Sequence, residues 1–380
     1  MKERNIFVEV ESRNEVPKAE LADAVDGTSW KNRIAIRRWL ATLIAGVVLT
    51  ILVGGATRLF DAGLAITEWK PISGALPPLS AADWNSEFEK YKQIPEFMLQ
   101  NSQMTLAEFK GIYWLEWVHR QLGRVLGVIW LTGFLWFAVG RKLRPGWTSR
   151  LLVLGVLGGT QALLGWWMVQ SGLIGTAVDV ASYKLAVHLL MAFFISGLIL
   201  WYILLLGHEP RDLFQARRNR EPKLGLLSWI LLSALTVQIA LGALVSGIDA
   251  GAAFPTWPLM NGQLVPSDAF ALTPLAVNFL ENPSLVQFNH RIAAYLILAG
   301  VAVLWWKGRQ SPYQTTRKAS NLLAVATVAQ AVLGVVTAVH GANPPTAILH
   351  QLGSIILFLL AVWFMFAGRY PVGRSVRSAR

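Results

Sequence analysis

The chain has 380 residues, of which 54% are hydrophobic and only 15% are charged, and it carries a formal net charge of +12 at pH 7 with no cysteine. This composition excludes an ordinary soluble enzyme and predicts a polytopic membrane protein. The lack of cysteine excludes structural disulfides, iron–sulfur clusters and thiolate-ligated metals. The positive charge is better explained by membrane topology and anionic lipid than by a nucleic-acid surface.

Eight apolar segments follow one another along the chain, and each is about 20 residues long, which is enough to cross a bilayer. The predicted spans are residues 37–58, 113–139, 150–170, 184–206, 225–247, 287–306, 319–341 and 347–367. The polar tail 1–36 precedes the first span. It has no short apolar core followed by a small-residue cleavage site, so we do not expect a cleaved signal peptide.

Basic residues gather in alternate connections, which predicts the orientation of the chain. The tail to Arg38, the segments 141–150, 211–223 and 307–318, and the tail from Arg369 together hold 25 of the 34 basic residues (8 + 4 + 5 + 4 + 4). By the positive-inside rule these stretches and both termini are cytoplasmic. We therefore expect a multi-pass protein of the bacterial inner membrane, or of the mitochondrial inner membrane if the chain is mitochondrial.

The first outer loop, residues 59–112, is longer than its later counterpart 248–286 and is predicted to be partly helical. Trp84, Phe88 and Tyr91 recur at helical spacing, which suits an aromatic helix at the membrane interface that covers the bundle. Thr105 and Glu108 have the spacing of a capping box at the start of the second span.

The chain carries an internal duplication. Asp61, Gly63, Trp69, Gly74 and Pro78 recur 188 positions later (249 − 61) as Asp249, Gly251, Trp257, Gly262 and Pro266. Further along the chain three more matches follow in order: His119-Arg120 with His290-Arg291, Gln161…Gly165 with Gln330…Gly334, and His188 with His350. We predict an all-α integral membrane fold with eight transmembrane helices, arranged as two parallel four-helix-bundle repeats. The halves are residues 37–206, including the outer loop 59–112, and residues 225–367, followed by the tail 368–380.

Four histidines lie at one depth and fall into two pairs. His119, His188, His290 and His350 each stand roughly 17–22 residues, or about 26–33 Å, from the cytoplasmic end of their span. Each half thus places two imidazoles at one level near the outer face, as bis-histidine ligation of a haem requires. A bare zinc or copper ion is disfavoured, because it needs three or four ligands and each half offers two.

The two remaining histidines are set apart from these pairs. His208 lies in a polar turn and is expected to be solvated, and His340 ends the seventh span without a partner in the first half.

Residues near the four histidines differ between the halves. Arg120, Arg124 and Arg291 could bind haem propionates or could extend to the membrane surface. Glu116 shares a helix face with His119, whereas its counterpart is Gln287. Glu116 is interpreted as a base or charge stabiliser at the first haem, with an ion pair to Arg120 as the alternative. Glycines at 54, 55, 165, 242 and 334 indicate close helix packing, or room for a flat macrocycle.

Several motifs together resemble the haem A synthase family, in its proteobacterial and mitochondrial branch, over about residues 35–367. They are Glu116-Trp117-Val118-His119-Arg120-x-x-Gly123-Arg124, Gly55-Ala56-Thr57-Arg58-Leu59, Asn289-His290-Arg291 and His350-Gln351. The resemblance implies an oxidoreductase that converts haem O to haem A, for haem-copper oxidases, by oxidising a ring methyl to a formyl group. It implies haem b on His290 and His350, and the substrate haem on His119 and His188 beside a catalytic Glu116. Some relatives carry a cysteine pair in an outer loop, which this chain lacks, so a thiol-dependent step cannot operate here in that form.

Alternatives remain at this point. A di-haem b-type electron carrier or quinol oxidoreductase would also use two histidine pairs, and the Glu116/Gln287 difference favours the enzyme over it. A transporter is disfavoured by the scarcity of acidic residues in the spans. The expected partners are haem O, the haem O synthase that supplies it, an electron-transfer partner and the lipid bilayer. The sequence leaves open the electron donor or acceptor, the oxygen source and homo-oligomerisation.

Overall fold

The computed structural model describes residues 30–371, and within them the chain is helical, with no β-strand. Eight of the described helices are long and apolar enough to cross a membrane, as predicted. The helices of the first half are α2 (Trp30–Leu59), α5 (Leu106–Val139), α6 (Trp147–Val169) and α7 (Ser182–Leu206). Those of the second half are α9 (Pro222–Gly247), α12 (Pro283–Gly308), α13 (Gln314–Val339) and α14 (Pro344–Arg369). Most of the tail 1–36 and the end of the tail 368–380 lie outside the described residues.

Six of the eight predicted spans lie inside these helices, which continue beyond the apolar stretch at most ends. The span 150–170 passes the end of α6 by one residue. The helices α9, α12 and α14 begin with proline in the first turn, where its missing N–H costs nothing. A second boundary was also too long: α13 ends at Val339, and His340 is its C-cap rather than a residue of the span. The exposed His340 ring bonds back to the carbonyl oxygen of Val336 at 2.8 Å.

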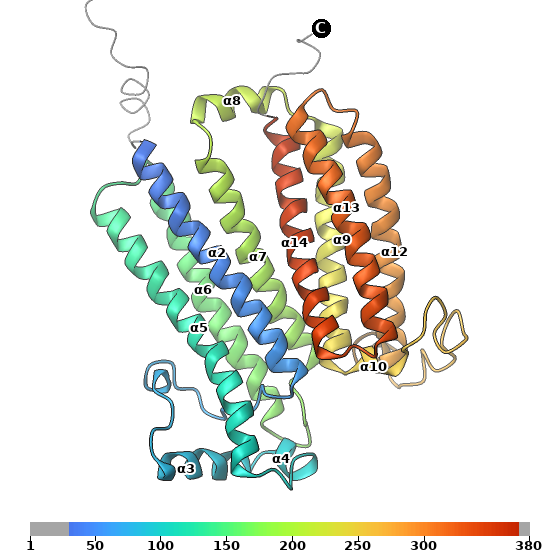
Figure 1. Ribbon diagram of the computed structural model, residues 1–380. Coiled ribbons are helices and arrows are strands. Elements are labelled where there is room, and N and C mark those ends of the chain that lie inside the picture. Colours follow the sequence, from blue (N-terminus) through green and yellow to red (C-terminus); the bar gives the residue numbers. More distant parts are fainter. Residues whose placement is uncertain (1–29, 372–380) are drawn as a thin grey trace, which may run out of the picture.

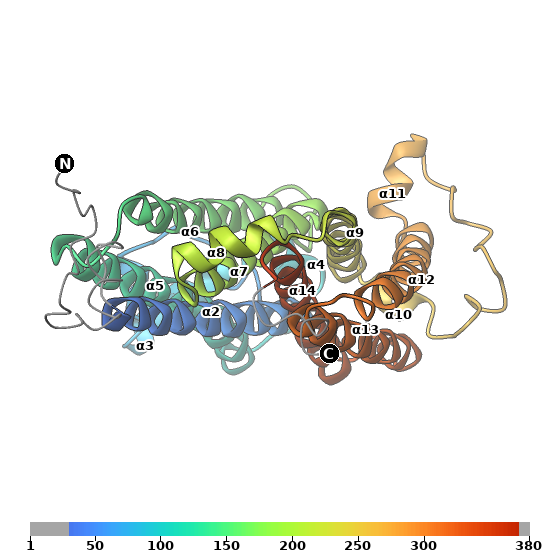
Figure 2. The ribbon, with the colours of Figure 1, turned by 90° about the horizontal axis from the view of Figure 1, so that it is seen from above.

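The helices form two neighbouring groups of four, one from each half of the chain (Figure 1). Seen along the helix axes in Figure 2, α7 and α14 lie between the groups, where α7 contacts α9 and α14 contacts both α7 and α2. The start of α2, the end of α14 and the short helix α8 (Pro210–Arg218) are at one end of the bundle. The connection that contains α3 and α4 is at the other end.

An ion-pair cluster joins the two halves at this second end. Arg58, in the last turn of α2, contacts Asp61 at 2.8 Å, Asp249 at 2.8 Å and Asp179 at 3.4 Å. Asp61 and Asp249 are the first matching pair of the duplication, and both have left-handed backbone conformations. The two corresponding turns of the halves therefore converge on one guanidinium.

The long outer loop forms a helical layer, as predicted, but its aromatic residues do not face lipid. It contains α3 (Ala81–Tyr91) and α4 (Pro95–Leu99), and the Thr105–Glu108 capping box starts α5. Trp84, Phe88 and Tyr91 are all buried and pack against the first turns of α5. The helix expected at the membrane interface thus belongs to a small aromatic core, because α5 extends beyond its predicted span and offers α3 an apolar surface.

His208 differs from the prediction in a similar way. Its ring is half-buried and stacks on Phe366, with centroids 5.9 Å apart, and its backbone carbonyl accepts a hydrogen bond from Arg33 at 3.3 Å. The turn 207–210 was read as solvated because it is polar, but it packs on the last turns of α14.

Candidate functional site

Each histidine pair comes from two helices that lie diagonally across a four-helix group. His119 on α5 and His188 on α7 belong to the first half, and α2 and α6 flank the two helices that carry them. In the second half α12 and α14 carry His290 and His350, and α9 and α13 flank them. All four imidazoles therefore point into the interior of a bundle rather than towards its outside, where lipid would lie.

The second pair has a geometry that can be measured against metal ligation. The ring centroids of His290 and His350 are 6.4 Å apart and the ring planes are inclined by 79°. A metal–imidazole bond of about 2.0–2.1 Å, with roughly 1.1 Å from the ligating nitrogen to the ring centre, gives about 6.2–6.4 Å between two axial ring centres. The two rings thus stand at the separation that one six-coordinate metal between them requires. His119 and His188 are close enough to interact electrostatically.

A glycine on the neighbouring helix faces every one of the four imidazoles. A Cβ added at Gly54, Gly165, Gly242 or Gly334 would lie 2.6, 2.8, 3.1 or 3.0 Å from Cε1 of His119, His188, His290 or His350. These glycines therefore leave room for the imidazole itself. These glycines were predicted to allow close packing, and they do. The group that packs closely against them is the histidine side chain.

A matched pair of glycines in α6 tests this role. If the chain has the activity that the family resemblance implies, Gly165→Ala should displace His188 and lower haem A formation several-fold, with haem b retained, because the added methyl group and the ring occupy the same space. Gly158→Ala, in the same helix, meets nothing within 4 Å and should behave as wild type. Extracted haem A per haem b is the measurement, and equal values for the two variants would contradict the role.

Glu116 is buried and both of its carboxylate oxygens have partners. Oε1 accepts two hydrogen bonds from Arg120, at 2.6 and 2.9 Å, and Oε2 accepts one from the backbone N–H of Ile66 at 2.7 Å. The ion pair between Glu116 and Arg120, which the sequence left as the alternative to a chemical role, is therefore present. It is not an exposed pair, since Glu116 is 3% exposed.

The arginines that follow the histidines fasten the outer loops to the bundle. Arg120 donates to the carbonyl oxygens of Ile66 (2.8 Å) and Glu68 (3.2 Å). Arg291 donates to those of Phe254 (2.7 Å) and Thr256 (2.8 Å), which are the same two positions displaced by 188. The corresponding contacts agree in the two halves, although no sequence pattern marks these carbonyls.

The carboxamide of Gln287 is bound differently from Glu116. Its nitrogen donates to the carbonyl of Gly251 at 3.3 Å and its oxygen accepts from Arg291 at 3.2 Å. The first half thus holds an acidic group, and the second half a neutral one, in otherwise similar surroundings.

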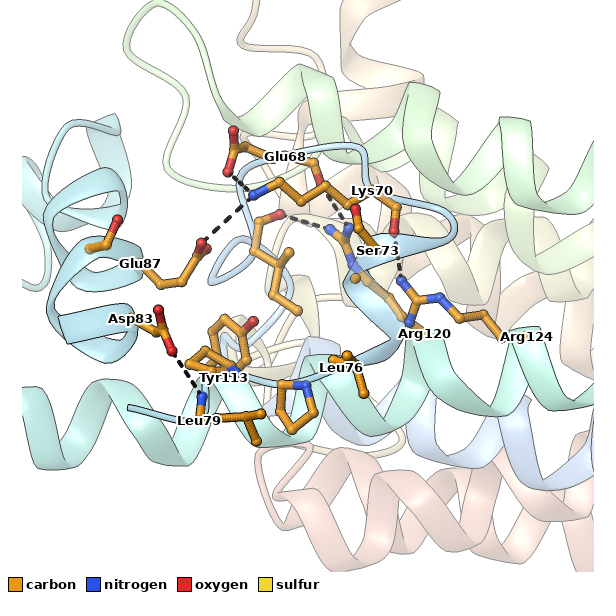
Figure 3. A pocket seen from close by; sticks show the side chains of 15 residues that line it. Glu68, Lys70, Ser73, Leu76, Leu79, Asp83, Glu87, Tyr113, Arg120 and Arg124 are labelled. Atoms are coloured by element: carbon orange, nitrogen blue, oxygen red, sulfur yellow. Dashed lines mark hydrogen bonds and ion pairs between the residues drawn. The ribbon is translucent and has the colours of Figure 1, made fainter. Parts of the chain in front are cut away.

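A cleft of about 310 Å³ lies beside Arg120, between the first outer loop and α5. Figure 3 shows Arg124 and Arg120 reaching from α5 to the loop, with Glu68, Lys70 and Glu87 on the other side. Arg124 donates to the carbonyl oxygens of Lys70 and Pro71, both at 3.0 Å. All three predicted arginines therefore have protein partners in this structure, and Arg120 and Arg124 line this cleft.

A second buried carboxyl, which the sequence reading missed, lies in the outer layer. Glu96 in α4 is 2% exposed, is hydrogen-bonded to the phenol of Tyr91, and its Oε2 has no partner. Burial raises the pKa of Glu96 to about 8, and the nearby negative charges of Asp179, Asp61 and Glu116 act in the same direction. The hydrogen bond from Tyr91 opposes them.

A pH-dependent stability follows from this shift. The folded pKa exceeds the unfolded value, so the contribution of Glu96 is complete below about pH 4.5 and is lost as the pH rises through about 8. Glu96→Gln removes the loss, so the variant should gain stability over wild type by about 2 kcal/mol between pH 6 and 8.5. Thermal unfolding of the detergent-purified protein at both pH values checks this. An equal difference at the two values would show that Glu96 does not titrate in this range.

Comparison with known proteins gives one consistent result. Residues 37–362 match the model of a family described as cytochrome oxidase assembly protein. The chain is 52% identical to the Heme A synthase of Dinoroseobacter shibae, covering 100% of this chain and 99% of the relative. It is 51% identical to the Heme A synthase of Ruegeria pomeroyi (98% and 99%) and 46% identical to that of Paracoccus denitrificans (99% and 99%).

Proposed function

This chain belongs to the family of cytochrome oxidase assembly proteins, and we propose that it catalyses the reaction for which its relatives are named, the formation of haem A. It is a membrane oxidoreductase that acts on haem O, whose ring methyl becomes a formyl group. The similarity extends over the whole chain, so it includes both four-helix halves described here.

The two histidine pairs allow the proposal to name the residues that bind each haem. We assign the substrate haem to His119 and His188 and a permanent haem b to His290 and His350, in halves 37–206 and 225–367. The 6.4 Å between the rings of the second pair and the glycines that make room for every imidazole support ligation by these histidines. The Glu116/Gln287 difference supports placing the substrate haem in the first half. Within residues 30–371 no group of three or more histidine, aspartate or glutamate side chains could hold a bare metal ion, whereas a haem needs only two axial ligands.

The chain's own residues then orient and surround the substrate. Bound haem supplies the redox-active iron and the methyl group to be oxidised. Glu116, three residues before His119, places a carboxylate next to that site, and Arg120 and the Ile66 N–H hold it in position. The carboxylate can accept a proton that leaves the carbon, or its charge can stabilise a cationic ring. The aromatic layer of α3, α4 and the start of α5 covers this end of the first half and limits access of water.

One experiment tests the reaction itself. The chain is expressed together with a haem O synthase in a host that makes no haem A, and the extracted pigments are identified by mass. We expect haem A together with haem b. Unchanged haem O with haem b bound to the purified protein would instead support the di-haem electron carrier.

The orientation in the membrane is a second proposal. We place both termini in the cytoplasm and the histidines and α3 on the periplasmic side. The basic connections and the outer layer are at opposite ends of the bundle, which supports this orientation (Figure 1). Reporters fused after Arg144, Arg218 or Lys318 should therefore read cytoplasmic, and one within residues 80–100 should read periplasmic. An inverted reading at any fusion would overturn the proposed orientation.

A further inference from the structure

Three of the four histidines are held by a glutamine from the neighbouring helix. The side-chain nitrogens of Gln161, Gln238 and Gln330 donate to the backbone carbonyls of His188 (3.1 Å), His290 (3.0 Å) and His350 (2.8 Å). The same nitrogen atoms also approach the imidazoles, at 3.3, 3.2 and 3.1 Å. Each amide thus touches both the backbone and the ring of its histidine.

The glutamines belong to a pattern that recurs on four helices. Each precedes by four residues the glycine that faces the same imidazole, as in Gln161 and Gly165, Gln238 and Gly242, and Gln330 and Gly334. On α2 the corresponding residue, four before Gly54, is Thr50. On α6, α9 and α13 one helical turn therefore carries both the amide that contacts a histidine and the glycine that leaves room for its ring. On α2, which faces His119, the glycine is present without the amide.

Thr50 does not replace the missing amide. Its hydroxyl donates to the carbonyl of Gly46 at 2.8 Å within its own helix. The His119 ring hydrogen-bonds to the backbone of Thr50, and its Nδ1 has no hydrogen-bond partner. His119 is consequently the one histidine of the four without a side-chain amide against it.

The oxygen atoms of all three glutamine amides are buried and have no hydrogen-bond partner. It is the amide nitrogens that lie against the rings, at 3.3, 3.2 and 3.1 Å. Groups that contact a metal-binding imidazole from outside the coordination sphere fix the orientation of its ring, and their loss weakens the ligand. Both histidines of the second pair have such an amide, and the first pair has one only on the His188 side.

We propose that Gln161, Gln238 and Gln330 are positioning residues for the axial imidazoles, and that Thr50 makes His119 the exchangeable ligand of the first site. This rests on the proposed function, in which the second site retains its haem while the first must accept haem O and release haem A. Removal of such an outer contact of a ligand typically costs 10- to 100-fold in metal affinity. The glutamines thus favour retention of haem b in the second half, and the threonine in place of a glutamine favours exchange of the haem in the first half.

The test exchanges the two residues in the full-length protein. Haem transfer from purified protein to excess apomyoglobin is followed, together with the low-spin electron paramagnetic resonance signal of haem b. Gln238→Thr should release haem b about 10- to 100-fold faster than wild type, with shifted resonance positions. Thr50→Gln should leave haem b unchanged and slow the release of the first-half haem about 10-fold or more. The control Thr236→Val lies on α9, where the hydroxyl bonds only to its own helix, and should match wild type.

The outcomes separate this inference from the proposed function. Release of haem b at the wild-type rate from Gln238→Thr would overturn the positioning role even if wild-type protein makes haem A normally. Faster release from Gln238→Thr in a protein that makes no haem A would support the positioning role and refute the function. If Thr50→Gln does not assemble, Gln238→Thr still decides the positioning role, and Gln161→Thr replaces the other arm. Faster loss of the first-half haem from Gln161→Thr would support the inference, and an unchanged rate would refute it.

Discussion

Replacing His290 or His350 with alanine is expected to strip haem b from the protein, with at least about a tenfold loss of the low-spin signal. One imidazole cannot keep the iron six-coordinate between two helices. The glutamine opposite the removed ring also loses its contact with the ring and keeps only its bond to the backbone carbonyl. The absorption spectrum of the purified variant, normalised to protein, is the measurement.

The first pair should respond differently. His119→Ala and His188→Ala should retain haem b and lose haem A formation, since only the substrate site is damaged. His340→Ala is the matched control, because its ring is exposed and bonds only to its own helix. A full wild-type haem b signal in both His290→Ala and His350→Ala would show that the histidines are paired wrongly.

Much of this architecture could be predicted from sequence periodicity. Hydrophobic length gave the eight spans, and the drifting offsets of the duplication paired His119 with His290 and His188 with His350 before any contact was known. Both signals can be read from the sequence alone, because neither depends on which helices are neighbours in the fold. The flanking Gln161 and Gln330 were visible as a matched pair, but their role was not, because it depends on which helices are neighbours.

Other features lie beyond such reasoning. The carbonyls of Ile66 and Phe254 carry no side-chain signature, so their bonds to Arg120 and Arg291 appear only when the loops fold back. The helical spacing of Trp84, Phe88 and Tyr91 predicts a helix, but the spacing does not show whether the apolar face of that helix contacts lipid or protein. The same limit applies to Glu96, whose burial is created by residues distant in the sequence.

An exposed ion pair is worth roughly 0–1 kcal/mol. The Glu116–Arg120 pair is different, since Glu116 is buried and its partner is largely covered. Removing one member of a buried pair commonly costs about 3–5 kcal/mol. Arg120 keeps its two loop carbonyls in Glu116→Gln, so we expect a smaller cost, of about 1–3 kcal/mol.

Glu116→Gln is expected to retain haem b and to lower haem A formation by about 100-fold or more, the range in which a positioned proton acceptor contributes. The substitution reproduces in the first half the Gln287–Arg291 arrangement of the second, which the fold already tolerates. Haem O or a partly oxidised intermediate should accumulate in the protein. The ratio of haem A to haem O, each measured per haem b after extraction, removes the effect of lower protein yield.

A purely structural Glu116 predicts the opposite pattern. The variant would then be less stable, but each folded molecule would make haem A at nearly the wild-type rate. Gln287→Glu is the matched control: it adds an acid beside Arg291 in the second half and should leave haem A formation intact, because no methyl group is oxidised there. Near-normal haem A per haem b in Glu116→Gln would leave Glu116 as a clamp for Arg120, and the residue that removes protons from the substrate would have to lie elsewhere around the first histidine pair.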